Sequence, residues 1–167
     1  DALPILMRHL HRADALGVDL GVDFAEGLDL PLFILAQRAL LEGALDNLID
    51  NALKFCSAGA RIRVGAASHA NGVRVWVTDN GPGVVQEQIP RIFGKLLYGS
   101  KFHSMKQSRG QQGIGISAAG MYGQLTTGQP IRVVSRTGKG KPTHSFDIQI
   151  DTRKNAPVVT RDEALDD

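Results

Sequence analysis

One face of a long apolar helix carries two amides and an ammonium group. Apolar residues recur every three or four positions between residues 40 and 55, which predicts a helix. Asn47, Asn51 and Lys54 stand at i, i+4 and i+7 and therefore share one face. Amide oxygens suit Mg²⁺, and an ammonium group suits a phosphate. An ordinary solvated helix face would look the same, so this pattern alone leaves both interpretations open.

A second group of residues follows an alternating run that predicts a strand over residues 73–78. Asp79 comes directly after that run, with Gly81 and Gly83 next to it. A carboxylate at the end of a strand can accept a hydrogen bond from the exocyclic amine of a base, and glycines let the base approach the backbone. A plain turn uses the same residue types, so the signal is weak by itself.

The third group is a glycine-rich segment before a helix that we expect to begin near residue 113 and to end before residue 126. Backbone N–H groups at a helix N-terminus bind anions. The segment is not a P-loop, because no Gly-Lys-Ser/Thr follows, and the strand order of a Rossmann fold is missing. The candidate anion-binding residues of this segment are Arg109, Gly110, Gln111, Gln112, Gly113, Ile114 and Gly115. The family resemblance given below adds Lys101 and Lys106 as groups that neutralise phosphate charge, and a solvated basic loop is the alternative for these two lysines and Arg109.

The remaining pattern predicts the elements that position these groups. We expect a helix that ends near residue 17, a strand over 18–24, and a hairpin of strands 61–67 and 73–78 that turns at Asn71-Gly72. Two further strands are expected at 131–136 and 145–150. This order predicts an α/β two-layer sandwich with a mixed sheet and helices on one face. We expect a single domain over residues 1–155 and a flexible polar tail over 156–167.

Composition narrows the class of protein. A chain of 167 residues, 43% hydrophobic and 22% charged, is typical of one soluble globular domain. The net charge of +2 and the lack of interleaved aromatic residues argue against nucleic-acid binding. No apolar run is long enough to cross a bilayer. We therefore expect a cytoplasmic monomer, and we interpret its only cysteine, Cys56, as a small buried apolar residue.

Taken together, in this order and with these gaps, the three groups resemble the N box, the first glycine box and the lid of the Bergerat, or GHKL, ATPases. The resemblance covers nearly the whole chain and implies binding of ATP or ADP with Mg²⁺. It implies that Asn51 ligates the metal, that Asn47 helps to position metal or water, and that Lys54 approaches a phosphate. The adenine side would use Asp79 for the amino group, with the remaining wall formed by Gly81, Gly83 and either Thr126 or Thr127.

The resemblance divides between two branches of that family. Residues 1–93 resemble the catalytic ATP-binding domain of a sensor histidine kinase, through LLEGALDNLIDNALKF and VRVWVTDNGPGV. Residues 93–160 resemble the B subunit of DNA topoisomerase VI, through FGKLLYGSKFH and QSRGQQGIGISAAGMYGQLTTG. We interpret the chain as a chimera joined between Ile89 and Phe93. The alternative is one divergent family that retains both signatures.

The two resemblances affect the expected activity. Topoisomerase VI relatives carry a glutamate at the position of Asn47, and an amide cannot accept the proton of an attacking water. Asp46 and Asp50 point about 100° away on the helix. We expect a nucleotide-binding module with little standalone hydrolysis; the alternatives are an active ATPase, a kinase acting on a histidine in trans, or a scaffold without nucleotide. The parent families would use a histidine phosphoacceptor domain or a topoisomerase transducer as partner.

Overall fold

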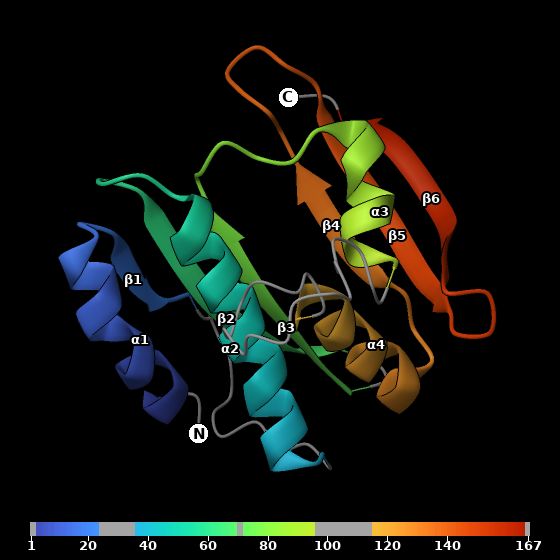
Figure 1. Cartoon of the computed structure of the whole chain (residues 1–167), viewed down its shortest axis with the longest axis horizontal. Helices are drawn as coiled ribbons and strands as arrows, with labels where there is room; N and C mark the ends of the chain where they lie inside the picture. Colours follow the sequence, from blue (N-terminus) through green and yellow to red (C-terminus); the bar gives the residue numbers. More distant parts are fainter. Residues whose placement is uncertain (1–2, 24–35, 70–71, 96–114, 166–167) are drawn as a thin grey trace, which may run out of the picture. The chain divides into compact units, whose positions relative to one another are not determined.

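The computed structural model describes residues 3–23, 36–69, 72–95 and 115–165 (Figure 1). Contacts divide the chain into two compact units, Asp1–Gly81 and Pro82–Asp167, where the sequence predicted one domain. Each unit has its own sheet and its own core, and each is described by itself below. None of the described helices is long and apolar enough to cross a membrane.

The first unit contains two helices and a mixed three-stranded sheet. Strand β1 pairs in parallel with β2, and β2 pairs antiparallel with β3 as the predicted hairpin. Each predicted element of this half is present, with ends within a few residues of those expected. The elements are α1 (Leu3–Ala15), β1 (Asp19–Val22), α2 (Arg38–Phe55), β2 (Arg61–His69) and β3 (Gly72–Asp79).

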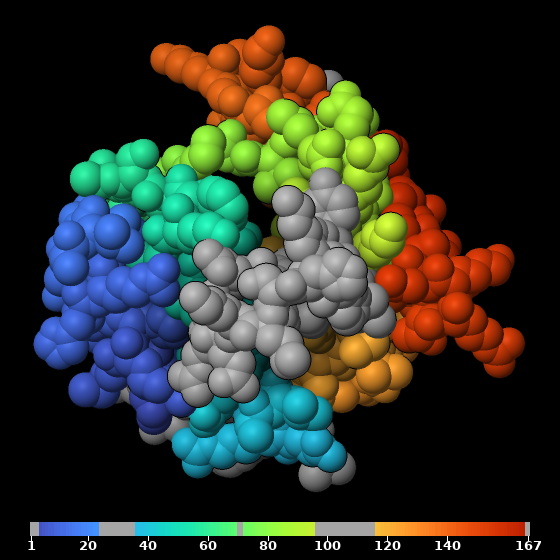
Figure 2. Space-filling view, in the orientation of Figure 1, coloured from blue at the N-terminus to red at the C-terminus, as the bar shows by residue number. Residues whose placement is uncertain are grey.

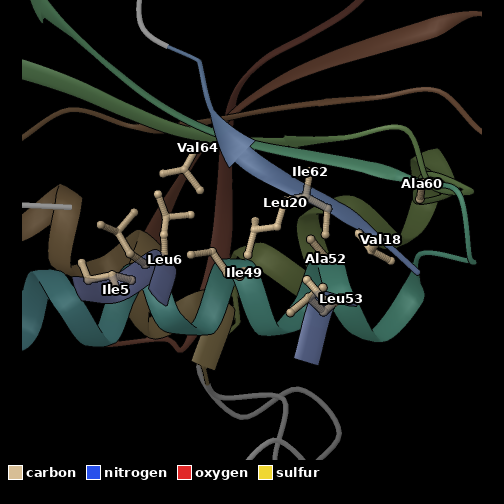
Figure 3. Packing of buried hydrophobic residues seen from close by; sticks show 12 residues of the cluster. Ile5, Leu6, Val18, Leu20, Ile49, Ala52, Leu53, Ala60, Ile62 and Val64 are labelled. Carbon is tan, nitrogen blue, oxygen red and sulfur yellow. The ribbon is translucent and has the colours of Figure 1, made fainter. Parts of the chain in front are cut away.

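The core of the first unit lies between α2 and the sheet. The apolar face of α2 includes Ile49 and Leu53, which Figure 3 shows next to Leu20, Ile62 and Val64 of the strands. Ile49 and Ile62 are fully buried, each with 0% of its surface exposed. Burying one such side chain stabilises the fold by about 1.5–3 kcal/mol. The 3.6-residue period of α2 therefore fixes which of its faces meets the sheet and which polar face remains outside.

The second unit contains an antiparallel sheet in the order β4-β5-β6 and two short helical segments next to a longer helix. Its core is built on Phe146 and Ile148 of β5 and on Ile89, each at most 2% exposed. The elements are η1 (Gln86–Gln88), α3 (Ile89–Phe93), α4 (Gly115–Thr127), β4 (Ile131–Ser135), β5 (Thr143–Asp151) and β6 (Ala156–Leu165).

The expected flexible tail is instead a strand. Strand β6 pairs along the whole of β5, from Asp151↔Ala156 to Thr143↔Leu165, and the prediction of a flexible tail was wrong. A tight turn joins the two strands, because Asp151 Oδ1 accepts hydrogen bonds from the backbone N–H groups of Arg153 and Lys154 at 2.9 and 3.0 Å. Most of β6 lies at the surface of its unit (Figure 2). It therefore lacks the buried alternating face that would have marked it in the sequence.

Candidate functional site

Helix α2 presents the predicted polar stripe. The side chains of Asn47 and Asn51 are half-buried, and neither makes a hydrogen bond to another described residue. Lys54 is exposed, with its ammonium nitrogen 5.3 Å from the centre of the Phe55 ring. Half-buried amides without protein partners retain hydrogen-bonding capacity that a ligand can satisfy. The binding roles of these three residues remain predictions.

The carboxylates of α2 face α1 and lie away from Asn47 and Asn51. Asp46 accepts a hydrogen bond from the ring of His9 (Nε2 to Oδ1, 2.9 Å) and pairs with Arg8 at 3.2 Å. Asp50 pairs with Arg12 at 2.6 Å. The sequence placed both carboxylates away from Asn47, but it did not predict their partners in α1, which are more than thirty residues distant along the chain. These two acids hold α1 against α2.

Asp79, the last residue of β3, has one carboxylate oxygen fixed by two donors. The backbone N–H of Gly81 donates to Oδ1 at 2.8 Å, and the thiol of Cys56 lies 3.7 Å from the same oxygen. The other oxygen, Oδ2, has no hydrogen-bond partner among the described residues. Helix α2 packs against β3. Asp79 therefore lies in the same unit as Asn47, Asn51 and Lys54 of α2. The arrangement offers one acceptor oxygen at an exposed strand end.

Cys56 contacts Asp79, which the sequence does not predict. It follows the last residue of α2, is half-buried and packs against the apolar core of its unit, in partial agreement with its interpretation as a small buried apolar residue. Burial raises the pKa of its thiol to about 11, and the charge of Asp79 acts in the same direction. No local pattern links these two residues, since they lie 23 positions apart.

The two glycines predicted for the adenine wall are required by different neighbours. A Cβ on Gly81 would lie 2.8 Å from Asp79 Oδ1 and 3.0 Å from the Cys56 sulfur. Gly83 has φ +70°, and a Cβ there would lie 2.1 Å from the carbonyl oxygen of Arg136. Gly81 thus belongs to the surroundings of Asp79, whereas Gly83 is explained by packing within the second unit.

The other predicted residues lie in or before α4. Gly115 is the first residue of that helix. The hydroxyls of Thr126 and Thr127, in its last turn, donate to the carbonyls of Tyr122 and Gly123 at 2.8 and 2.7 Å. The roles assigned to these three residues remain predictions. Outside the described residues lie the other predicted lid positions, namely Lys101, Lys106, Arg109, Gly110, Gln111, Gln112, Gly113 and Ile114.

Comparison with known proteins decides the family. Residues 36–153 match the family model described as the histidine kinase-, DNA gyrase B-, and HSP90-like ATPase. The chain belongs to this family. It is the GHKL family that the three motifs resemble, so that part of the sequence interpretation is confirmed, together with the α/β sandwich fold.

Curated relatives come from the topoisomerase branch. The chain is 46% identical over 135 residues to the B subunit of type 2 DNA topoisomerase 6 from Methanosarcina barkeri, a match that covers 78% of this chain and 22% of the relative. It is 57% identical over 84 residues to the same protein of Halobacterium salinarum, covering 50% and 10% respectively. The chain therefore spans about a fifth or less of the length of these relatives.

Solved structures with a similar fold come from the kinase branch. The catalytic domain of histidine kinase ThkA, in a nucleotide-free form, has a TM-score of 0.62 and 20% identity, covering 81% of this chain and 82% of that domain. The mycobacterial sensor histidine kinase MprB has a TM-score of 0.54 and 19% identity, covering 94% and 89%. At this level of identity the likeness shows the fold alone.

The extent of the topoisomerase match bears on the proposed crossover. Residues 93–167 make up less than half of the chain, whereas the match to the Methanosarcina barkeri protein covers 78% of it. The similarity therefore extends well to the N-terminal side of Ile89. Both resemblances are supported, and the chimera joined between Ile89 and Phe93 stays an interpretation.

Proposed function

We propose that this chain binds an adenine nucleotide together with Mg²⁺ and that Asp79 selects the base. The observation that carries the proposal is the state of the Asp79 carboxylate, with Oδ1 held by two donors and Oδ2 without a described partner. An ionised carboxylate accepts only, so it would pair with the exocyclic amine of adenine and repel a base that carries an oxygen at that position. Family membership supports a nucleotide as the ligand.

The metal and phosphate side of the proposal uses α2. Asn51, helped by Asn47, would supply amide oxygens to Mg²⁺, and Lys54 would approach a phosphate oxygen. The fit rests on amides that are half-buried and bond to no other described residue. The lid residues 101–115 would add positive charge and backbone N–H donors to the phosphates. Bound Mg²⁺ would neutralise phosphate charge, and the residues of α2 would orient it.

We further propose that hydrolysis by this chain alone is slow. A general base must accept the proton of the attacking water, and the amide of Asn47 cannot do so. The neighbouring acids of α2 are already engaged, because Asp46 and Asp50 pair with α1 and Glu42 pairs with Arg38 at 2.6 Å. The module would then act by binding nucleotide, as a monomer in the cytoplasm. Its relatives are proteins of much greater length, which suggests that other domains respond to the bound nucleotide.

Thermal unfolding with and without Mg²⁺ and ADP tests the proposal. Ligand at about a hundredfold its Kd stabilises a protein by about 2.7 kcal/mol, which corresponds to a rise of about 5–10 °C in Tm for a chain of this size. Asp79→Asn should abolish the rise. With its carbonyl oxygen held by the two donors, the amide NH₂ of Asn would replace Oδ2 and would face the amine of adenine, which is also a donor. Asp14→Asn, at an exposed acid of α1 whose side chain has no partner among the described residues, is the matched control and should retain the full rise.

Two outcomes would contradict the proposal. An unchanged Tm for the parent at millimolar nucleotide would mean that the family fold is retained without its ligand. An equal rise in the parent and in Asp79→Asn would mean that Asp79 does not recognise the base. A phosphate-release assay on the same samples measures hydrolysis, and rapid turnover that depends on Asp79 would favour the active ATPase instead.

A further inference from the structure

We propose that Cys56 is a positioning residue for base recognition: its thiol, with the backbone N–H of Gly81, holds Oδ1 of Asp79 so that Oδ2 faces the nucleotide. The inference rests on the proposed function, because it assigns a role to Cys56 through Asp79. It is carried by two donors that converge on one oxygen. The thiol lies 3.7 Å and the N–H 2.8 Å from Oδ1, and the missing Cβ of Gly81 leaves room for both.

The thiol is held in place by the end of α2. Cys56 caps that helix in an extended conformation, and its backbone N–H donates to the carbonyl of Ala52 at 3.0 Å. A Cβ on Gly81 would lie 3.0 Å from the sulfur, which is closer than a Cβ ordinarily approaches a neighbouring atom. The sulfur lies between the helix end and the turn after β3, in space that a side chain on Gly81 would occupy. A change at Cys56 would be transmitted directly to the Asp79 carboxylate.

The thiol must be protonated to donate. Its pKa, raised to about 11 by burial and by the charge of Asp79, means that it remains protonated at neutral pH. Two donors on Oδ1 make the two carboxylate oxygens inequivalent, since rotation of the carboxylate would give up both hydrogen bonds. With one donor removed, the carboxylate is less strictly oriented, and Oδ2 presents its lone pairs to the base less well. The thiol thus affects selectivity without touching the nucleotide.

Selectivity between adenine and hypoxanthine nucleotides separates positioning from simple stability. ADP carries an amine at the position where IDP carries a carbonyl oxygen, so only ADP can donate a hydrogen bond to Oδ2 from that position. If Cys56 has only a structural role, its substitution would weaken the binding of ADP and of IDP equally. A positioning role would lower the preference for ADP over IDP, because both the contact with the amine of ADP and the repulsion of the carbonyl oxygen of IDP depend on the orientation of Oδ2.

The experiment measures the Kd of ADP and of IDP, each with Mg²⁺, by calorimetry on the parent chain, Cys56→Ala, Cys56→Ser and Ser57→Ala. A hydrogen bond to a charged acceptor contributes about tenfold or more to affinity, and a less strictly oriented Oδ2 gives up part of it. Cys56→Ala should therefore reduce the preference for ADP by up to about tenfold. Cys56→Ser keeps a donor and should retain the preference to within about threefold. Ser57→Ala removes an exposed hydroxyl at the next position and should leave it unchanged.

A second measurement checks the contact itself without nucleotide. The chain has a single cysteine, so its S–H stretching band in the infrared reports one thiol. The band should lie at the frequency of a hydrogen-bonded thiol in the parent and move to that of a free thiol in Asp79→Ala. An unchanged preference for ADP in Cys56→Ala, or an unchanged band in Asp79→Ala, would overturn the inference. If the parent bound neither nucleotide, the proposed function would fail together with it; if the parent preferred ADP and Cys56→Ala did so equally, only this inference would fail.

Discussion

At the scale of single residues, the backbone and the neighbours of Gly83 require a glycine. Its φ of +70° is unfavourable for a residue with a Cβ, and that atom would lie 2.1 Å from the carbonyl oxygen of Arg136. The adjacent Val84 is fixed as well, because its N–H donates to the hydroxyl of Ser135 at 2.7 Å and its carbonyl accepts from the same hydroxyl at 3.0 Å. The chain between Gly83 and Val84 therefore cannot move aside easily.

We expect Gly83→Ala to lower the free energy of unfolding by about 2–4 kcal/mol, of which about 1–2 kcal/mol comes from the left-handed backbone and the rest from the contact with Arg136. Gly59→Ala is the matched control, because Gly59 has φ +82° and no described atom within 4 Å of the place where a methyl group would stand. It should lose only the backbone part. Urea unfolding followed by circular dichroism measures both, and equal losses would show that the contact with Arg136 relaxes at no cost.

The residues of the candidate site differ in how far the sequence could predict them. Asn47, Asn51 and Lys54 share a face because a helix has a fixed period, so their placement follows from local pattern alone. The contact between Cys56 and Asp79 joins a helix end to a strand end, and it depends on how α2 packs against β3. A partner 23 residues away leaves no periodic signal in the sequence, so the sequence predicts the apolar packing of Cys56 but not its contact with Asp79.

At the scale of elements, α1 is joined to α2 by charged groups as well as by apolar contacts. His9 is only 8% exposed and lies against Asp46 at 2.9 Å, with its other ring nitrogen 3.4 Å from Asp50. Arg8, which also contacts Asp46, is half-exposed. A buried hydrogen-bonding group that loses its partner costs more than an exposed ion pair that is broken, so the two contacts to Asp46 differ in weight.

We expect Asp46→Leu to lower the free energy of unfolding by about 1–3 kcal/mol, because it leaves the His9 ring without its closest acceptor. Arg8→Ala should cost at most about 1 kcal/mol, since that pair is solvated. Urea unfolding gives both values, and hydrogen exchange of the α1 amides reports whether that helix opens first. A loss in Arg8→Ala as large as that in Asp46→Leu would mean that the exposed pair, and not His9, holds α1.

The elements themselves were predictable where burial imposes a period. Helix α2 and the β2–β3 hairpin follow from apolar spacing and from the Asn71-Gly72 turn signal. Strand β6 was missed because it packs few side chains, with Val158 and Val159 at 44% and 41% exposure. Its place in the sheet comes largely from backbone pairing with β5, which requires no apolar periodicity in the sequence. An edge strand of this kind is recognised only from the strand that it pairs with.

At the scale of the whole molecule, arginine residues depress the carboxyl pKa values of both units. The closest partner is Arg63 for Asp19, Arg38 for Glu42, and Arg132 for Asp147, and each lowers the pKa of its acid below the ordinary value of 3.8 for aspartate or 4.5 for glutamate. The Arg132–Asp147 pair is bidentate, at 2.7 and 2.8 Å, and joins β4 to β5. Its geometry makes it the strongest of these contacts.

We expect the free energy of unfolding to stay level between about pH 7 and 5.5 and to fall as the pH drops through about 4.5 and then below 3.8. A depressed pKa in the folded state means that the unfolded chain binds protons first, so the stabilisation is complete above the ordinary pKa and is lost on acidification. Asp147→Asn should be less stable than the parent at pH 7. Its free energy of unfolding should fall less on acidification, because it lacks one carboxylate that takes up a proton on unfolding. Asp19→Asn, at an exposed acid, should change the slope less. Urea unfolding at constant ionic strength between about pH 7 and 2.5 measures these slopes, and a parent that gains stability below about pH 4 would show that repulsion among its acids outweighs the arginine pairs.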